Sequence, residues 1–159
     1  MAIVKPFKAV RPSRDKVALV SSKSFDAYTD KELDAKLEFN PFTFLHIINP
    51  GYKYHQEFTG EQRFQMIHNR YEEFKENKIF IKDTTDSFYI YESSDAHNSF
   101  CGIIAATAVD DYINGCIKKH EGTIKKREEL FESYLKTTGF NAEPVLLTSE
   151  DDENFNKLL

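Results

Sequence analysis

The clearest hydrophobic pattern in the chain lies between residues 60 and 76, where apolar residues recur every three or four positions. This spacing places one row of side chains on a single face of a helix. The row consists of Phe64, Ile67, Tyr71 and Phe74. Thr59 and Gln62 stand where a capping box would begin such a helix. The sequence therefore predicts an amphipathic helix over residues 60–76.

Two further helices are predicted, one in each half of the chain. Thr29 and Glu32 fit a second capping box, so we expect a helix over residues 30–38. The other is expected over residues 121–137, with Gly139 as its C-terminal breaker. Both are short enough to pack as surface helices of one domain.

Short apolar runs between these helices indicate strands. The expected strands lie at residues 3–10, 42–48, 79–81, 88–91, 100–109 and 144–148. A polar turn at residues 83–87 joins the third and fourth, and the nearly unbroken run at 100–109 is typical of a strand covered on both faces. Arg11-Pro12 is expected to end the first strand. Because strand ends commonly carry site residues, Arg11 is a candidate binding residue.

The alternation of strands and helices predicts an α+β domain built on a mixed sheet, with α/β as the alternative class. A single globular domain is expected over residues 1–148. Residues 149–159 are acidic and weakly apolar. They are interpreted as a tail, either a frayed end or the start of a further part.

The composition argues against three classes: nonspecific nucleic-acid binders, membrane-spanning proteins and metal sites. The 159 residues carry a formal net charge of −5, which argues against nonspecific binding to nucleic acid. No segment approaches the roughly twenty apolar residues of a membrane span. Cys101 and Cys116 are expected as reduced, partly buried thiols of a cytoplasmic protein, and no metal site is predicted. His46, inside an apolar run, is expected as a hydrogen-bonded structural histidine.

The candidate chemistry gathers in residues 115–127, which hold a histidine, a carboxylate, a hydroxyl and several cations. His120, Thr123 and Arg127 are three and four residues apart, so we expect them on one side of the last predicted helix. Helix N-termini present unpaired N–H groups and a positive dipole end, which suit anions. The segment therefore predicts an anion or nucleotide-phosphate site, opened by Gly115.

Several of these residues allow a second interpretation. Glu121 is a candidate general base or magnesium partner, but the helix dipole alone also favours an acidic residue in a first turn. His120 and Arg127 could instead pair with internal carboxylates such as Asp110 or Asp111. The chain has no Walker loop, dinucleotide glycine fingerprint or nucleophile elbow. Any nucleotide would therefore need a different phosphate cradle.

A set of motifs spread over nearly the whole chain resembles one family. The motifs are Lys5-Pro6-Phe7, Arg11-Pro12, Asn40-Pro41-Phe42, Phe44-Leu45-His46, Asp110-Asp111-Tyr112, Gly115, His120-Glu121, Thr123 and Glu143-Pro144-Val145-Leu146-Leu147-Thr148. They resemble the family known as domain of unknown function ten-fifteen. Its members are longer, so the resemblance implies that this chain is an N-terminal portion with a C-terminal remainder as partner. Leu130 and Phe131 depart from the Asp-Arg pair of the family pattern.

A more distant similarity concerns the order of elements from Gly115 to Leu146. A glycine, a basic cluster, a helix, a second glycine and a Pro-Val-Leu strand are similar to the ParB and sulfiredoxin superfamily. Members of that superfamily include nucleotide-hydrolysing DNA partition proteins, sulfiredoxin and kinases for free serine. The similarity implies a ParB/sulfiredoxin-like α+β fold and a phosphate cradle for ATP or ADP with Mg²⁺.

Two functions follow as expectations. The first is a small-molecule phosphotransferase, similar to serine kinases, or a nucleotide hydrolase. Its catalytic candidates are His120 and Glu121, and its binding candidates are Gly115, Thr123, Arg127 and Arg11. The alternative is a noncatalytic ligand-binding or regulatory module. The expected partner is a small-molecule ligand, and the acidic net charge disfavours DNA as a third candidate.

Overall fold

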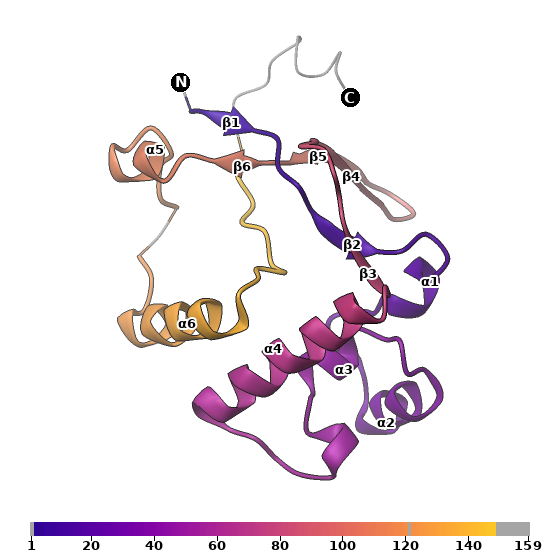
Figure 1. The fold of residues 1–159 in the computed structure, drawn as a ribbon. Coiled ribbons are helices and arrows are strands. Elements are labelled where there is room, and N and C mark those ends of the chain that lie inside the picture. The colour runs from indigo at the N-terminus through magenta and orange to yellow at the C-terminus, as the bar shows by residue number, and fades with distance from the viewer. Residues whose placement is uncertain (1, 121, 149–159) are drawn as a thin grey trace. The chain divides into compact units, whose positions relative to one another are not determined.

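A computed structural model describes residues 2–120 and 122–148 (Figure 1). These residues form helices and short antiparallel sheets, which confirms the α+β prediction. They group into two compact units between which the chain alternates. Unit 1 comprises Met1–Ala9, Asp83–Gly122 and Asn141–Leu159, and unit 2 comprises Val10–Lys82 and Thr123–Phe140. The prediction of one globular domain over residues 1–148 stays a prediction.

Unit 2 is mainly helical and contains one small sheet. In chain order its elements are β2 (Val10–Pro12), α1 (Val17–Val20), the 3₁₀ turn η1 (Phe25–Ala27), α2 (Asp30–Phe39), α3 (Leu45–Ile48), the 3₁₀ turn η2 (Tyr52–Tyr54), α4 (Gly60–Glu76), β3 (Phe80–Lys82) and α6 (Lys125–Thr138). Strands β2 and β3 pair antiparallel, with Arg11 opposite Ile81. Of the break expected at Arg11-Pro12-Ser13, only Ser13 lies outside the strand, because Arg11 and Pro12 belong to β2. Pro12 is tolerated because it closes an edge strand.

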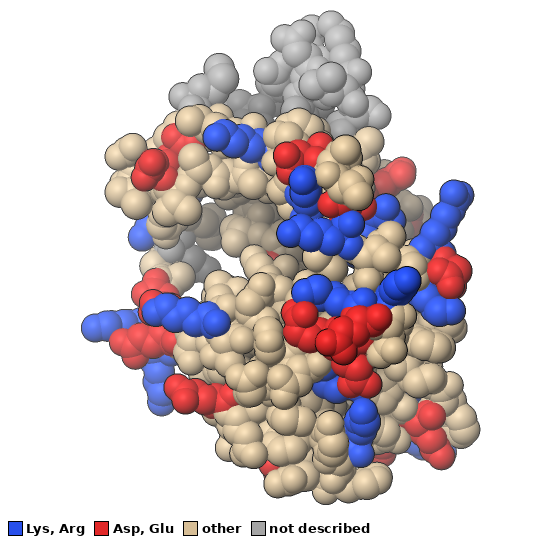
Figure 2. Space-filling view, viewed as in Figure 1, with Lys and Arg blue, Asp and Glu red and all other residues tan. Residues whose placement is uncertain are grey.

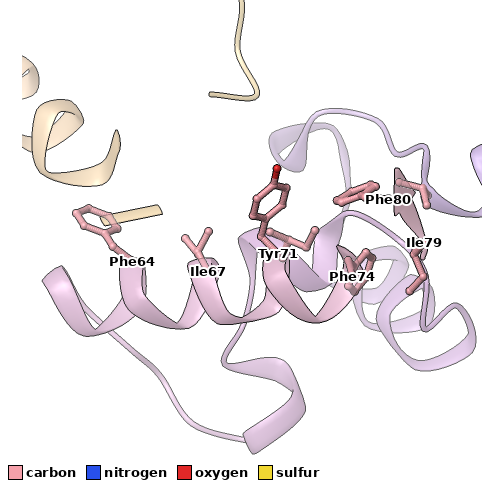
Figure 3. Close-up of a cluster of buried hydrophobic side chains, with 8 residues drawn as sticks. Phe64, Ile67, Tyr71, Phe74, Ile79 and Phe80 are labelled. Atoms are coloured by element: carbon pink, nitrogen blue, oxygen red, sulfur yellow. The ribbon is translucent and has the colours of Figure 1, made fainter. Parts of the chain in front are cut away.

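The predicted helix over residues 60–76 is confirmed as α4, and it organises the core of unit 2. Figure 3 shows its apolar row pointing to one side, together with Ile79 and Phe80 from the segment that follows. The rings of Tyr71 and Phe140 lie 4.2 Å apart, and those of Phe64 and Tyr134 lie 5.4 Å apart. The core therefore joins α4 to α6 and to the residues after it.

The two predicted capping boxes have different outcomes. At α2 the box forms: the Thr29 side chain accepts a bond from the Glu32 amide, and the Glu32 carboxylate accepts one from the Thr29 amide at 2.9 Å. At α4 the Thr59 side chain makes no capping bond, so the predicted box with Gln62 is wrong. Gly60 follows Thr59 with a φ of +55°, a left-handed conformation that glycine adopts readily and that differs from an ordinary first helical residue.

This contrast gives a matched pair of threonine variants. Thr29→Ala is expected to lower the free energy of unfolding by about 1 kcal/mol, because it removes an N-cap acceptor. Thr59→Ala removes a hydroxyl with no capping bond, so its effect is expected to stay below about 0.5 kcal/mol. Urea unfolding of both variants checks the difference. Equal losses would contradict it.

One expected strand of unit 2 is a helix. Residues 42–48 were predicted as a strand, but α3 occupies their second half. The Asn40 side chain accepts a bond from the Phe42 amide at 3.1 Å and starts the turn that leads into α3. In a short apolar run, the spacing of the residues cannot tell a strand from a buried helix. Here the turn at Asn40 directs the chain into a helix.

The last predicted helix is confirmed with a later start. Helix α6 begins at Lys125 rather than at residue 121, because Ile124 still has an extended backbone. It ends at Thr138, and Gly139 follows with a φ of +74°, as predicted for a C-terminal breaker.

The described residues of unit 1 form two small sheets and one short helix. Strands β1 (Val4–Lys5) and β6 (Ala106–Thr107) pair antiparallel, and β4 (Tyr89–Ser94) pairs with β5 (Ser99–Ile104) as a hairpin. The Asp95 carboxylate accepts bonds from the amides of His97 and Asn98 and so fixes the hairpin turn. Helix α5 (Val109–Ile113) follows β6.

Several strand predictions fail in unit 1. Among the described residues the strands form three two-stranded antiparallel sheets in place of the expected mixed sheet. The expected pair around the turn at 83–87 does not form, since β3 pairs with β2 and β4 with β5. The run at 100–109 divides among β5, β6 and α5, and much of it is exposed. Residues 144–148 form no strand, and Val145 is 82% exposed.

Candidate functional site

The structure divides the predicted site residues between the two units. Unit 1 holds Gly115 and His120, and unit 2 holds Arg11, Thr123 and Arg127. Glu121 lies outside the described residues. The two groups are described separately here, and their assembly into one site stays a prediction.

In unit 1, Gly115 ends the turn after α5. Its φ of +75° is left-handed, which favours glycine, and its amide donates to the Tyr112 carbonyl at 3.3 Å. The Asp111 carboxylate accepts a bond from the Ile3 amide at 2.6 Å, which ties the start of the chain to α5. Among the described residues of unit 1, exposed His120 makes no ion pair with Asp111. Asp111 therefore has a structural role.

In unit 2, the predicted segment supplies the N-terminus of α6. The N-cap residue is Ile124, and no side chain of the described residues caps the first turn. The Thr123 hydroxyl, just before the helix, donates to the Glu128 carboxylate. His120 and Thr123 both precede α6, so the expected helical face shared by His120, Thr123 and Arg127 is wrong. Only Arg127 belongs to the helix.

The first turn of α6 concentrates positive charge. Its first three residues are Lys125, Lys126 and Arg127, and its acidic residue is Glu128. Among the described residues these three cations make no ion pair. Cations at a helix N-terminus oppose the helix dipole, at a cost of about 0.3–1 kcal/mol each. Figure 2 shows Lys and Arg side chains projecting over α6, beside acidic ones. An anion here would offset both the dipole and the cations.

A buried polar cluster in unit 2 includes His46, which was expected as a structural histidine, and Arg70, which the sequence analysis missed. Arg70 on α4 and His46 on α3 are each only 7% exposed. The Arg70 guanidinium forms an ion pair with Glu73, whose carboxylate also lies 3.5 Å from the Lys53 ammonium. Burial acts to raise the pKa of Glu73, but its bond to Arg70 and the nearby cations hold that pKa below the usual value. Arg70 lies three residues after Ile67, and this position on the apolar face was the available signal.

A shallow groove of about 730 Å³ lies beside α2. Its lining residues include Ser21 and Ser22, which follow α1, and Phe39, which is largely exposed. The groove includes none of the predicted site residues. It therefore adds no support to the predicted site.

The two cysteines are free thiols, and both are exposed, so the expectation of partial burial is wrong. Cys101 lies on the β4–β5 hairpin, where a two-stranded sheet leaves its side chains accessible. Within the part of the chain that the structure describes, no three His, Cys, Asp or Glu side chains gather as metal ligands.

Comparison with known proteins decides the family. A family model described as "Protein of unknown function (DUF1015)" matches residues 4–159. The chain belongs to the DUF1015 family. This confirms the resemblance drawn from its motifs, whereas the similarity to the ParB and sulfiredoxin superfamily is not shown. No curated protein and no solved structure matches this DUF1015 chain. None of its described helices combines the length and the apolarity that a membrane span needs.

Proposed function

We propose that this DUF1015 chain binds a nucleotide phosphate, of ATP or ADP, at the N-terminus of α6. One observation carries the proposal: among the described residues, no side chain caps the first turn of α6, and Lys125, Lys126 and Arg127 make no ion pair. Unpaired helical N–H groups beside cations are the usual elements of a phosphate site. The order of glycine, basic cluster and helix, similar to the ParB and sulfiredoxin superfamily, supports the same proposal.

The finer proposal is a small-molecule phosphotransferase or a nucleotide hydrolase, with serine as acceptor only through the kinase analogy. Phosphoryl transfer depends mainly on positioning and on neutralising charge. Arg127 supplies a planar donor that suits phosphate oxygens. His120 and Glu121 are the proposed groups that orient the acceptor hydroxyl or water. Glu121 is the proposed partner of Mg²⁺, which would neutralise negative charge on the phosphates, and Gly115 and Arg11 are the other proposed binding residues.

The binding proposal is tested by a thermal-shift titration with ATP, ADP and CTP, each with and without Mg²⁺. Arg127→Gln is expected to weaken nucleotide binding about tenfold or more, because hydrogen bonds to charged groups contribute about 1.5–3 kcal/mol. Lys136→Gln is the matched control, since it neutralises a cation at the opposite end of α6. It is expected to leave the affinity unchanged. A wild-type melting temperature that no nucleotide shifts would rule the proposal out.

A noncatalytic ligand-binding or regulatory module is the second candidate. The observation in its favour is that the charged end of α6 lies wholly in unit 2, whereas His120 belongs to unit 1. The three cations of the proposed phosphate site therefore belong to one unit, whereas the proposed chemistry depends on His120 of the other. Release of inorganic phosphate or transfer to serine supports the enzyme. Saturable binding without turnover in the presence of Mg²⁺ supports the module.

A further inference from the structure

His46 occupies an unusual position for a titratable side chain. It lies in the four-residue helix α3 between Leu45 and Ile47, which are both fully buried. Its Nε2 atom is buried and has no hydrogen-bond partner in the described part of the chain. The imidazole meets the ring of Tyr52 edge-on, with 5.9 Å between the ring centroids. The environment thus suits a neutral imidazole and offers its Nε2 no acceptor.

The charges that face His46 are mostly positive. Arg70 approaches from α4 and Lys53 from η2, and both act on the pKa of His46. Glu73 on α4 is the carboxylate of this cluster, and it already contacts both cations. The Nε atom of Arg70 is also buried without a partner. A proton on His46 would therefore add a third positive charge around one carboxylate.

We propose that His46 is an acid-sensitive latch: when its ring takes up a proton, α3 separates from α4. Burying a charge without a partner is costly, and moving α3 outward lets water solvate the imidazolium. The same movement withdraws Leu45 and Ile47 from their buried positions. Acid therefore opens unit 2 locally at α3, and the rest of its core stays packed.

The direction of the pH dependence follows from the surroundings of His46. Burial is the main cause that lowers its pKa, the Arg70 charge adds to it, and the carbonyls of Asn40 and Leu37 act in the opposite direction. The folded-state pKa thus lies below the ordinary value of about 6.5. Unfolded or opened chains take up the proton first. The closed state is fully stable above about pH 6.5, the pKa of His46 in an open or unfolded chain. Between that pKa and the lower pKa of the closed state, each fall of one pH unit lowers the equilibrium constant for closing by up to tenfold.

The pH range in which His46 lowers stability differs from the pH range in which the neighbouring carboxylates do so. The pKa of Glu73 is held below its usual value, and so is that of Glu32 in the capping box of α2. Their contributions to stability are present above the ordinary glutamate pKa of about 4.3 and are lost only as the pH falls below it. A loss of stability between pH 6.5 and 5 therefore reports on histidine.

The first test compares urea unfolding of the wild type and His46→Leu between pH 7.5 and 5. The wild-type folding constant is expected to fall by up to tenfold per pH unit relative to the variant. His97→Gln, which changes an exposed histidine in the β4–β5 turn, should follow the wild type. The proposal is overturned if His46→Leu keeps the full wild-type pH dependence.

The second test needs no substitution. An NMR titration of the wild-type chain should place the His46 midpoint below pH 6.5. Hydrogen exchange, corrected for the intrinsic pH effect, should show lost protection at the amides of Ile47 and Asn49 near pH 5. Both amides bond to carbonyls at the start of α3. A midpoint at or above 6.5, or α3 protection that stays constant relative to α6, would refute the latch.

Discussion

Phe74→Ala is expected to lower the free energy of unfolding by about 3–5 kcal/mol, as for other large-to-small changes in cores. Phe74 is 2% exposed and stands at the end of the apolar row of α4. Its ring lies 5.5 Å from that of Phe80, and the Arg70 guanidinium lies 5.5 Å above it. The alanine variant leaves a cavity bordered by both. It also leaves the buried Arg70 charge without its aromatic neighbour.

The matched control is Phe39→Ala. Phe39 ends α2 and is 80% exposed, so removing its ring leaves no cavity. Its effect is expected to lie within about 0.5 kcal/mol. Urea unfolding, followed by far-ultraviolet circular dichroism, measures both variants. A loss below 1 kcal/mol for Phe74→Ala would show that this core does not stabilise unit 2 as described.

Gly51→Ala is expected to destabilise unit 2 by about 1–3 kcal/mol through overpacking. Gly51 precedes η2, and an added Cβ would lie 2.1 Å from the backbone carbonyl oxygen of Gln56. A backbone atom has no alternative rotamer, so the loop itself must shift. That shift would strain the bond from the Gln56 amide to the Gly51 carbonyl, now 3.2 Å. The loop that carries Tyr52 and Lys53 to His46 would move with it.

Gly122→Ala is the control for this substitution. A Cβ at Gly122 meets nothing within 4 Å, and its backbone is not left-handed. The variant is expected to be neutral or slightly stabilising, because alanine reduces the freedom of the unfolded chain. Thermal unfolding of the pair checks the comparison. A Gly51→Ala protein as stable as the control would mean that the loop relaxes freely.

Helices were predictable where local signals agreed. Helix α4 has a long apolar period, and its bounds match the prediction, while α2 has a complete capping box at Thr29. Helix α3 was missed because four residues are too few for a period to show. The start of α6 was placed too early because a run of polar residues has no feature that marks where an extended backbone becomes helical.

Strands were less predictable because a strand needs a partner. Residues 145–148 are apolar or β-branched, yet the described structure places them in no strand. β-propensity describes how a residue fits a sheet surface and does not supply the neighbouring strand. The pairing of β2 with β3 joins segments about seventy residues apart, and no local pattern at Arg11 indicates it.

The candidate site was predictable in part. The cationic segment was visible as a motif, and the structure places Arg127 in the first turn of a helix. The separation of His120 from Arg127 was not visible, because residues seven apart in sequence fall in different units. Arg70 was overlooked because a charged residue within an apolar row is ordinarily assumed to face water, whereas His46 was expected as a structural histidine but without the cations that surround it.

The alternating division of the chain has a consequence for synthesis on the ribosome. Unit 2 lacks α6 until residue 140 has emerged, although its first segment is complete at residue 82. During that interval the rings of Tyr71 and Phe64 have no Phe140 or Tyr134 to pack against. The nascent chain thus exposes an apolar surface for about sixty residues of elongation, or several seconds at usual rates. Chaperones that bind exposed aromatic side chains would meet this surface during those seconds.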